Sequence, residues 1–133
     1  MFKIKSVVLC DDVRIENNGK YLLLGVYTGG VVFGAPEPLI LPSFRAFITA
    51  FTDLQVIEGE VRVRAESSDA SLLTTNIRME RSGVDNSDVT RLDISIPIGP
   101  IQFASIGKYL VEYNFGDKQW NLIDEFEVIV AVN

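Results

Sequence analysis

The sequence predicts an all-β fold, a two-sheet antiparallel sandwich of the immunoglobulin-like kind, with a small closed or partly open β-barrel as the alternative. Three observations predict it. Apolar and polar residues alternate with a period of two in segments such as 43–51 and 59–65. Gly, Asn, Asp and Pro clusters interrupt such segments at intervals of about 8–12 residues, as in known sandwiches. No segment carries the apolar stripe of an amphipathic helix.

The N-terminal quarter predicts a hairpin followed by a short strand. A first strand is expected over residues 2–16, bent at Asp11-Asp12, and Asn17-Asn18-Gly19 predicts a tight turn because Asn and Gly accept positive φ. The returning segment 20–27 is almost continuously apolar, which predicts a strand covered on both faces in the middle of a sheet. Residues 31–33 are expected to form a further short strand.

The rest of the chain predicts a connection and six more strands. Segment 34–42 is expected to be irregular and to cross between sheets, since Pro36, Pro38 and Pro42 each lack an N–H donor. A single helical turn is expected nowhere except residues 67–72. With no linker and no internal repeat, residues 1–133 are expected to form one domain. The strands are expected at 44–52, 56–66, 73–81, 89–98, 109–115 and 120–132, the last two joined by a turn at 116–118.

Tyr109 follows Gly107 by two residues and opens an alternating strand. Immunoglobulin-like sandwiches place a tyrosine at such a corner, where its hydroxyl bonds to upstream backbone. Tyr109 is therefore either a corner tyrosine or an ordinary core aromatic residue.

The first third of the chain carries a set of short motifs: Cys10-Asp11-Asp12-Val13-Arg14-Ile15-Glu16, Gly19-Lys20, Leu24-Gly25-Val26-Tyr27 and Leu41-Pro42. In this order they resemble an uncharacterised family of small bacterial and phage proteins. The resemblance implies a domain of unknown function, mostly a stand-alone cytosolic protein, and it implies no catalytic residue.

Composition narrows the classes of function. The chain has no histidine, which removes the commonest general base and metal ligand, and its single cysteine allows neither a disulfide framework nor a thiolate zinc site. A net charge of −6 repels phosphate backbones, and no apolar run is long enough to cross a bilayer. We therefore expect a cytoplasmic protein that is not an enzyme, with no catalytic residue, no metal, no cofactor, and neither nucleic acid nor membrane as partner.

Cys10, Asp11 and Asp12 lie in the first predicted strand. Neighbours in a strand point to opposite faces, so Asp11 and Asp12 are not expected to share one metal ion or proton. Asp12 would share a face with Arg14 and Glu16 as an ion ladder. Cys10 has no histidine beside it to lower its pKa, which favours a buried and unreactive thiol.

Four arginines form a candidate anion site: Arg62, Arg64, Arg78 and Arg91 fall on outward positions of three successive strands. If those strands are neighbours, the guanidinium groups converge on a phosphate or carboxylate. The alternative is ordinary surface pairing, because acidic residues occupy the same predicted faces. These residues are Glu60, Glu66, Glu80 and Asp93.

Leu39, Ile40 and Leu41 form a candidate partner contact in the proline-bounded connection. They either dock a partner or tuck beneath their own sandwich edge. Glu112 is expected in an acidic, solvated stripe on the last two strands. Four aromatic residues that could otherwise stack on a ligand are expected in the core, namely Tyr21, Tyr27, Tyr113 and Trp120.

These observations favour a non-catalytic protein-interaction module, bacterial or phage, that works through an edge strand or a loop and either binds another protein or self-associates. The alternative is a small-ligand binder that sequesters an anionic metabolite or a signalling nucleotide.

Overall fold

The computed structural model describes residues 1–81, 88–116 and 119–131, and over these residues the fold contains strands and no helix. The strands are β1 (Phe2–Ile15), β2 (Tyr21–Tyr27), β3 (Gly30–Phe33), β4 (Ile40–Leu41), β5 (Arg45–Thr52), β6 (Val56–Ala65), β7 (Leu73–Glu80), β8 (Thr90–Pro97), β9 (Ile101–Gln102), β10 (Gly107–Asn114) and β11 (Asn121–Val130).

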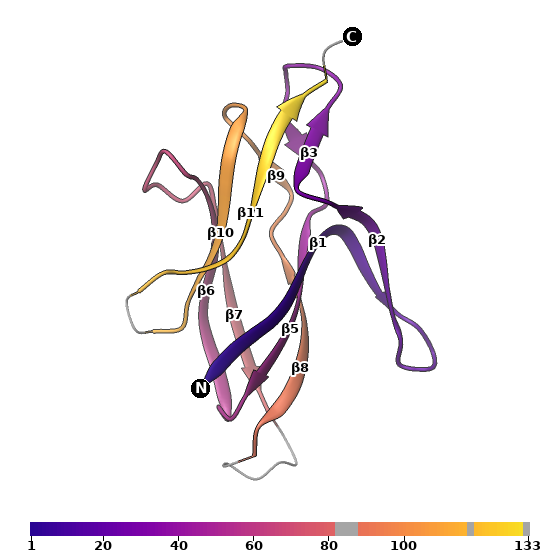
Figure 1. Cartoon of the computed structure of the whole chain (residues 1–133), viewed down its shortest axis with the longest axis vertical. Coiled ribbons are helices and arrows are strands. Elements are labelled where there is room, and N and C mark those ends of the chain that lie inside the picture. Colours follow the sequence, from indigo (N-terminus) through magenta and orange to yellow (C-terminus); the bar gives the residue numbers. More distant parts are fainter. Residues whose placement is uncertain (82–87, 117–118, 132–133) are drawn as a thin grey trace.

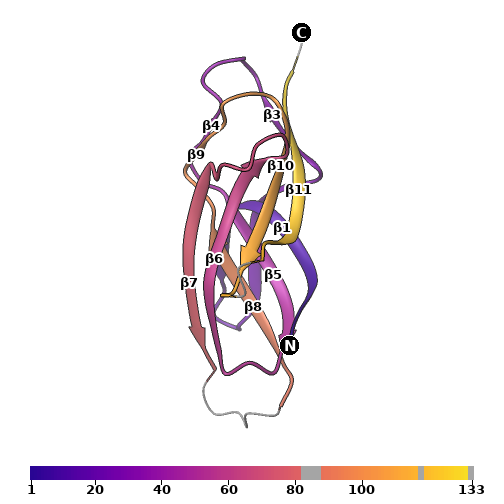
Figure 2. The same ribbon diagram turned by 90° about the vertical axis from the view of Figure 1, so that its left-hand side faces the viewer.

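The strands form two main sheets, which confirms the predicted all-β sandwich. The four-stranded sheet has the order β2-β1-β5-β8 and the five-stranded sheet the order β3-β11-β10-β6-β7, while β4 and β9 form a small third pair. Most strands run along the long axis of the molecule (Figures 1 and 2). The prediction of purely antiparallel pairing is wrong at β3, which pairs parallel with β11. The chain leaves β2 through Gly29, with φ +95°, and crosses to the other sheet, where β3 runs in the direction of β11.

The core lies between the two sheets and is built largely from alternate residues of the longer strands. Ala46, Ile48 and Ala50 of β5 are buried and belong to the same apolar cluster as Val61 and Val63 of β6. Aromatic rings extend this cluster. The Phe44 and Phe126 ring centroids lie 5.3 Å apart, and those of Phe103 and Tyr109 lie 4.8 Å apart. The period-two alternation in the sequence thus marks the residues that face the core.

Tyr109 takes the position of a corner tyrosine and also belongs to the core. Its hydroxyl donates a hydrogen bond to the backbone carbonyl of Ser105 at 2.6 Å, four residues upstream. Its ring is buried and stacks on Phe126. Both sequence-based interpretations therefore apply: the hydroxyl makes the corner hydrogen bond, and the ring belongs to the core.

The hairpin between β1 and β2 forms as predicted. Gly19 has φ +81°, its N–H donates to the Glu16 carbonyl at 2.9 Å, and the Glu16 N–H donates to the Lys20 carbonyl at 2.8 Å. β1 curves along its length, so that the end leading into β2 turns away from the long axis (Figure 1).

The prediction that residues 20–27 form a mid-sheet strand is wrong. Among the residues that the structure describes, β2 pairs with β1 alone and forms an edge of the four-stranded sheet. Leu22, Leu24 and Val26 keep 42%, 36% and 49% of their surface exposed. The apolar run predicted a strand whose two faces are both buried in the middle of a sheet. Instead, the next strand, β3, joins the other sheet, and β2 remains at an open edge.

Segment 34–42 crosses between the sheets as expected and contains the short strand β4, which pairs with β9. Residues 66–72 form turns and bends instead of the single helical turn admitted for 67–72. The predicted turn at 116–118 lies partly outside the described residues, but Tyr113 and Asn121 on either side of it pair as expected for a hairpin.

Candidate functional site

Two of the four predicted anion-site arginines meet, and they meet on a carboxylate. Arg62 and Arg64 of β6 donate through their Nε atoms to Oε1 of Glu112 on β10, at 3.0 and 2.7 Å. Glu112 is buried beneath them, and the Arg62 guanidinium lies 4.1 Å from the centre of the Trp120 ring. Cross-strand pairing places them together, since Arg62 is the register partner of Glu112. The prediction of a solvated Glu112 is therefore wrong.

Burial and hydrogen bonding act in opposite directions on Glu112. Burial raises the pKa of its carboxyl group. The hydrogen bonds from Arg64 and Arg62 lower the pKa by more than burial raises it, so the pKa of Glu112 lies below its ordinary value. The same contact with Glu112 raises the pKa of Arg64. Arg64 also donates to the backbone carbonyl of Ser68 at 3.0 Å. The cluster therefore stabilises the sheet and the adjoining turn.

Arg78 and Arg91 each pair with an acidic residue of their own strand instead of with Glu112. Arg78 on β7 pairs with Glu80 at 3.6 Å, and Arg91 on β8 pairs with Asp93 at 3.3 Å. β7 belongs to the five-stranded sheet and β8 to the four-stranded sheet, so the three successive strands are not neighbours in one sheet. The four arginines form ion pairs within the protein instead of one convergent site.

The predicted partner contact at residues 39–41 is largely inside the fold. Leu39 and Leu41 are buried in the core cluster, while Ile40 between them is 43% exposed. The two-residue strand β4 alternates its side chains in the same way as the longer strands. Only Ile40 of the three is available to a partner.

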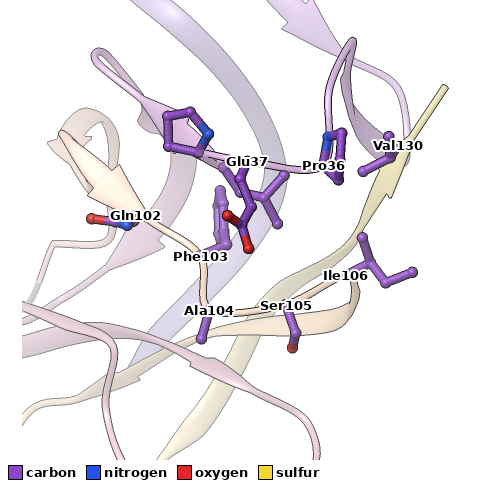
Figure 3. A pocket seen from close by; sticks show the side chains of 10 residues that line it. Pro36, Glu37, Gln102, Phe103, Ala104, Ser105, Ile106 and Val130 are labelled. Atoms are coloured by element: carbon purple, nitrogen blue, oxygen red, sulfur yellow. The ribbon is translucent and has the colours of Figure 1, made fainter.

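A groove of about 610 Å³ lies beside this connection, at the end of the molecule where the loops before β4 and after β9 meet (Figure 2). Pro36, Phe103 and Ile106 contribute to its apolar walls. Figure 3 shows the carboxylate of Glu37 directed into the groove, toward the loop that carries Ala104 and Ser105. A carboxylate in this position disfavours an anionic ligand.

Asp11 and Asp12 contact different residues and Cys10 is buried, as the sequence predicts. Cys10 is fully buried, and burial followed by the nearby charges of Asp11 and Asp12 raises the pKa of its thiol. Asp11 accepts a hydrogen bond from the Tyr27 hydroxyl, and Asp12 pairs with Arg14 at 3.4 Å. The expected ion ladder is thus present between Asp12 and Arg14.

The four aromatic residues considered for ligand stacking lie in separate places. The Tyr21 ring packs on Phe47 at 4.8 Å and the Tyr27 ring on Phe44 at 5.5 Å. Tyr113 contacts Phe2 at 5.7 Å, and Trp120 covers Arg62. They form no common platform in the described part of the chain.

Arg81 is a buried charge that the sequence analysis did not single out. Its guanidinium donates to the backbone carbonyls of Leu54 and Asp88 and to the Thr90 hydroxyl, the last two at 2.8 and 2.7 Å. These bonds join chain segments at the end of the molecule near the β5–β6 connection. Within residues 1–81, 88–116 and 119–131, no group of three or more His, Cys, Asp or Glu side chains is arranged to hold a metal ion, and no helix has the length and apolar character needed to span a bilayer.

The open edge of β2 differs from the other sheet edges. β7 carries Arg78 and Glu80 at its edge, and β8 carries Arg91 and Asp93. β3 is only four residues long. Charges and short length are the usual protection of an edge strand against pairing with another chain. β2 has seven residues, Tyr-Leu-Leu-Leu-Gly-Val-Tyr, and none is charged.

We call Leu22, Leu24 and Val26 the apolar edge. All three occupy alternate positions of β2 and are exposed to solvent. Sequence analysis missed them as site residues because an uninterrupted apolar run looks the same in a buried strand and in an exposed one. The absence of a charge within residues 21–27 was the available signal.

The fold and this edge define the chain as a two-sheet β-sandwich with one long, uncharged open strand. The chain belongs to a family of unknown function, DUF6941, which matches residues 5–125 and so covers most of its length. This confirms the predicted membership of an uncharacterised family, while the bacterial or phage origin stays a prediction. No curated protein and no solved structure matches the chain.

Proposed function

We propose that this chain is a non-catalytic protein-interaction module that binds its partner along the open edge of β2. The observation that carries the proposal is the contrast between β2 and the other edges: it is long, apolar and uncharged where the others are charged or short. Such an edge is a template for a strand of another chain, and proteins that do not use it protect it.

The backbone of β2 supports strand addition. The Glu16 N–H donates to the Lys20 carbonyl, so residues 16 and 20 form a hydrogen-bonded pair across the hairpin. Hydrogen-bonded and non-hydrogen-bonded pairs alternate along an antiparallel ladder. Leu22 therefore directs its backbone groups toward β1, while Tyr21 and Leu23 direct theirs toward the open edge. These groups are the donors and acceptors that an added strand needs.

The side chains of the apolar edge supply the second contribution. Burying apolar surface stabilises a complex by about 25 cal/mol per Å². Leu22 and Leu24 form a row on one side of β2, spaced to contact alternate residues of an added strand, and Val26 follows beyond Gly25. Backbone hydrogen bonds would supply affinity, and this row would supply selectivity for an apolar partner strand.

The alternative function, sequestration of an anionic metabolite or nucleotide, has weaker support. Arg62 and Arg64 are engaged with Glu112, and Glu37 occupies the groove at the end of the sandwich. A cytoplasmic location is part of the proposal, since the single thiol of Cys10 suits a reducing compartment.

A photo-crosslinking experiment tests the proposed function. A photoreactive amino acid is placed at Leu24 and, as the matched control, at the exposed Asn76 of edge strand β7. After irradiation in the cells that encode the protein, we expect discrete protein adducts from position 24 and none from position 76. An adduct with another protein or with a second copy supports the proposal. No adduct from position 24, or equal adducts from both positions, contradicts it.

A further inference from the structure

We infer that the occupant of the β2 edge is a second copy of this chain, paired antiparallel about a two-fold axis through Leu23. This inference rests on the proposed function and names its partner. The four-stranded sheets of the two copies would then join through their β2 strands into one continuous sheet of eight strands. The following observations carry it.

The charges around β2 suit a contact between identical chains. Each copy has a net charge of −6, so association through most of the surface brings like charges together. β2 itself is uncharged. The charged residues opposite it on β1 are Arg14, across from Leu22, and Asp12, across from Leu24. These two form an ion pair at 3.4 Å and cancel one another. The two charges nearest to Leu22 and Leu24 are therefore balanced, so they add little repulsion between two copies that approach along this edge.

The backbone directions select the register. Tyr21 and Leu23 direct their N–H and C=O groups away from β1, as the hairpin bond between Glu16 and Lys20 implies. A two-fold axis at Leu23 places these groups opposite those of Leu23 in the other copy, so that the two residues exchange both hydrogen bonds. The axis also limits the paired segment to Tyr21–Gly25, which ends at the backbone irregularity of Gly25, with φ +65°.

The same register joins apolar side chains. With Leu23 on the axis, Leu22 of each copy lies opposite Leu24 of the other, on the face where both are exposed in a single chain. In a non-hydrogen-bonded pair the facing side chains approach most closely. A strand that complements itself in this way is what a closed two-fold dimer requires.

An uncovered apolar edge also favours a partner that is always present. A free edge of this kind pairs with other chains and promotes aggregation. A second copy is produced wherever the first is produced, so it can cover β2 at all times. A different partner protein would cover the edge only when both proteins are present in matching amounts.

The test combines light scattering with charge substitutions at the two facing positions. We expect wild-type protein to have twice the 14.8 kDa mass of one chain. The double variant Leu22→Lys/Leu24→Lys places like charges opposite one another, so its dimer dissociation constant should rise by roughly tenfold or more. The double variant Leu22→Glu/Leu24→Lys places opposite charges at the same positions and should remain markedly more dimeric. Asn76→Lys on β7 should behave as wild type.

A second measurement reports the backbone pairing directly. The N–H of Leu23 is expected to be protected from hydrogen exchange at high protein concentration and to lose this protection on dilution. The N–H of Leu22, which faces β1, should stay protected at both concentrations. Circular dichroism of each variant establishes that it is folded, so that a monomeric variant is not mistaken for an unfolded one.

Each outcome separates the inference from the proposed function. A wild-type monomer up to millimolar concentration, with crosslinks from position 24 to another protein, overturns the self-pairing and leaves the interaction module standing. A monomer without crosslinks overturns both. A dimer that tolerates Leu22→Lys/Leu24→Lys, or that treats both double variants alike, shows that another surface or another register joins the copies and overturns the inference.

Discussion

Glu112 lies beneath Arg62 and Arg64, and this contact makes the stability of the fold depend on pH. Although burial raises its pKa, the hydrogen bonds from the two arginines outweigh burial and hold the pKa below the ordinary value of 4.5. A carboxylate whose pKa is lowered by folding stabilises the native state at pH values above its unfolded pKa. That contribution is lost as the pH falls through the folded pKa.

Glu112→Gln is therefore expected to destabilise the protein near neutral pH. The loss should be about 1.5–3 kcal/mol, the contribution of a hydrogen bond to a charged group. Urea denaturation at about pH 7 and again below the folded pKa measures it, and the gap from wild type should narrow in acid. Glu60→Gln, an exposed residue on the same sheet, is the control. A gap of equal size at both pH values would show that the charge of Glu112 is not the cause.

Tyr109 contributes through both its ring and its hydroxyl, and one substitution separates the two. Tyr109→Phe keeps the ring stacked on Phe126 but leaves the Ser105 carbonyl without its side-chain donor. The free energy of unfolding should fall by about 0.5–1.5 kcal/mol. Tyr21→Phe, on an exposed tyrosine, controls for loss of a hydroxyl. Equal unfolding midpoints for Tyr109→Phe and wild type would refute a stabilising role for the corner bond.

At the scale of elements, Gly59 lets β6 lie close to the end of β10. A Cβ atom at position 59 would clash with the Asn114 carbonyl and would lie 2.8 Å from the Cα of Phe115. Both obstacles are backbone, which cannot rotate out of the way as a flexible side chain can. The close approach of the two chain segments thus requires glycine here.

Gly59→Ala should separate β6 from the end of β10 and lower the free energy of unfolding by about 1–3 kcal/mol, the usual cost of overpacking. Chemical denaturation measures the loss. Gly34→Ala is the matched control, because a Cβ atom there meets nothing within 4 Å. If both glycine variants unfold at the same denaturant concentration, the close contact is not a constraint on the sheet.

At the scale of the whole molecule, the two sheets share one apolar cluster. Ile48 of β5 and Phe126 of β11 both belong to it, although they lie in different sheets. Neither sheet can bury its inner face without the other. We therefore expect residues 1–133 to unfold as a single cooperative unit.

Ile48→Ala and Phe126→Ala should each lower the same calorimetric transition, by about 2–5 kcal/mol. Ile106→Ala, at an exposed position, should leave it nearly unchanged. Splitting of the transition into two, with each core variant shifting only one part, would show that the sheets are separate folding units.

Features that depend on neighbouring residues could be predicted from the sequence, whereas features that depend on distant residues could not. The turn at Gly19 was predicted correctly because turn chemistry acts within a few residues. The inward-facing residues of β5 and β6 were predicted from alternation. Glu112 was misplaced, because its burial depends on Arg62 and Arg64, roughly fifty residues away in sequence.

β2 shows the same limit at the scale of an element. Its apolar residues were recognised, but their exposure was not, because whether a strand is central or at an edge depends on its neighbours. The candidate interaction site therefore emerged only from the strand order. The four predicted anion-site arginines do not converge for the same reason, because β7 and β8 are consecutive in sequence but belong to different sheets.

Period-two alternation and turn residues act locally, so the residues alone predict an all-β sandwich, the limits of most strands and the inward-facing side chains of β5 and β6. The pairing of distant segments sets which strands are edges, which charges are buried and, among the described residues, that the β2 edge is apolar and unpaired. Those properties depend on which segments meet across the fold, and long-range pairing leaves little trace in the local pattern of residues.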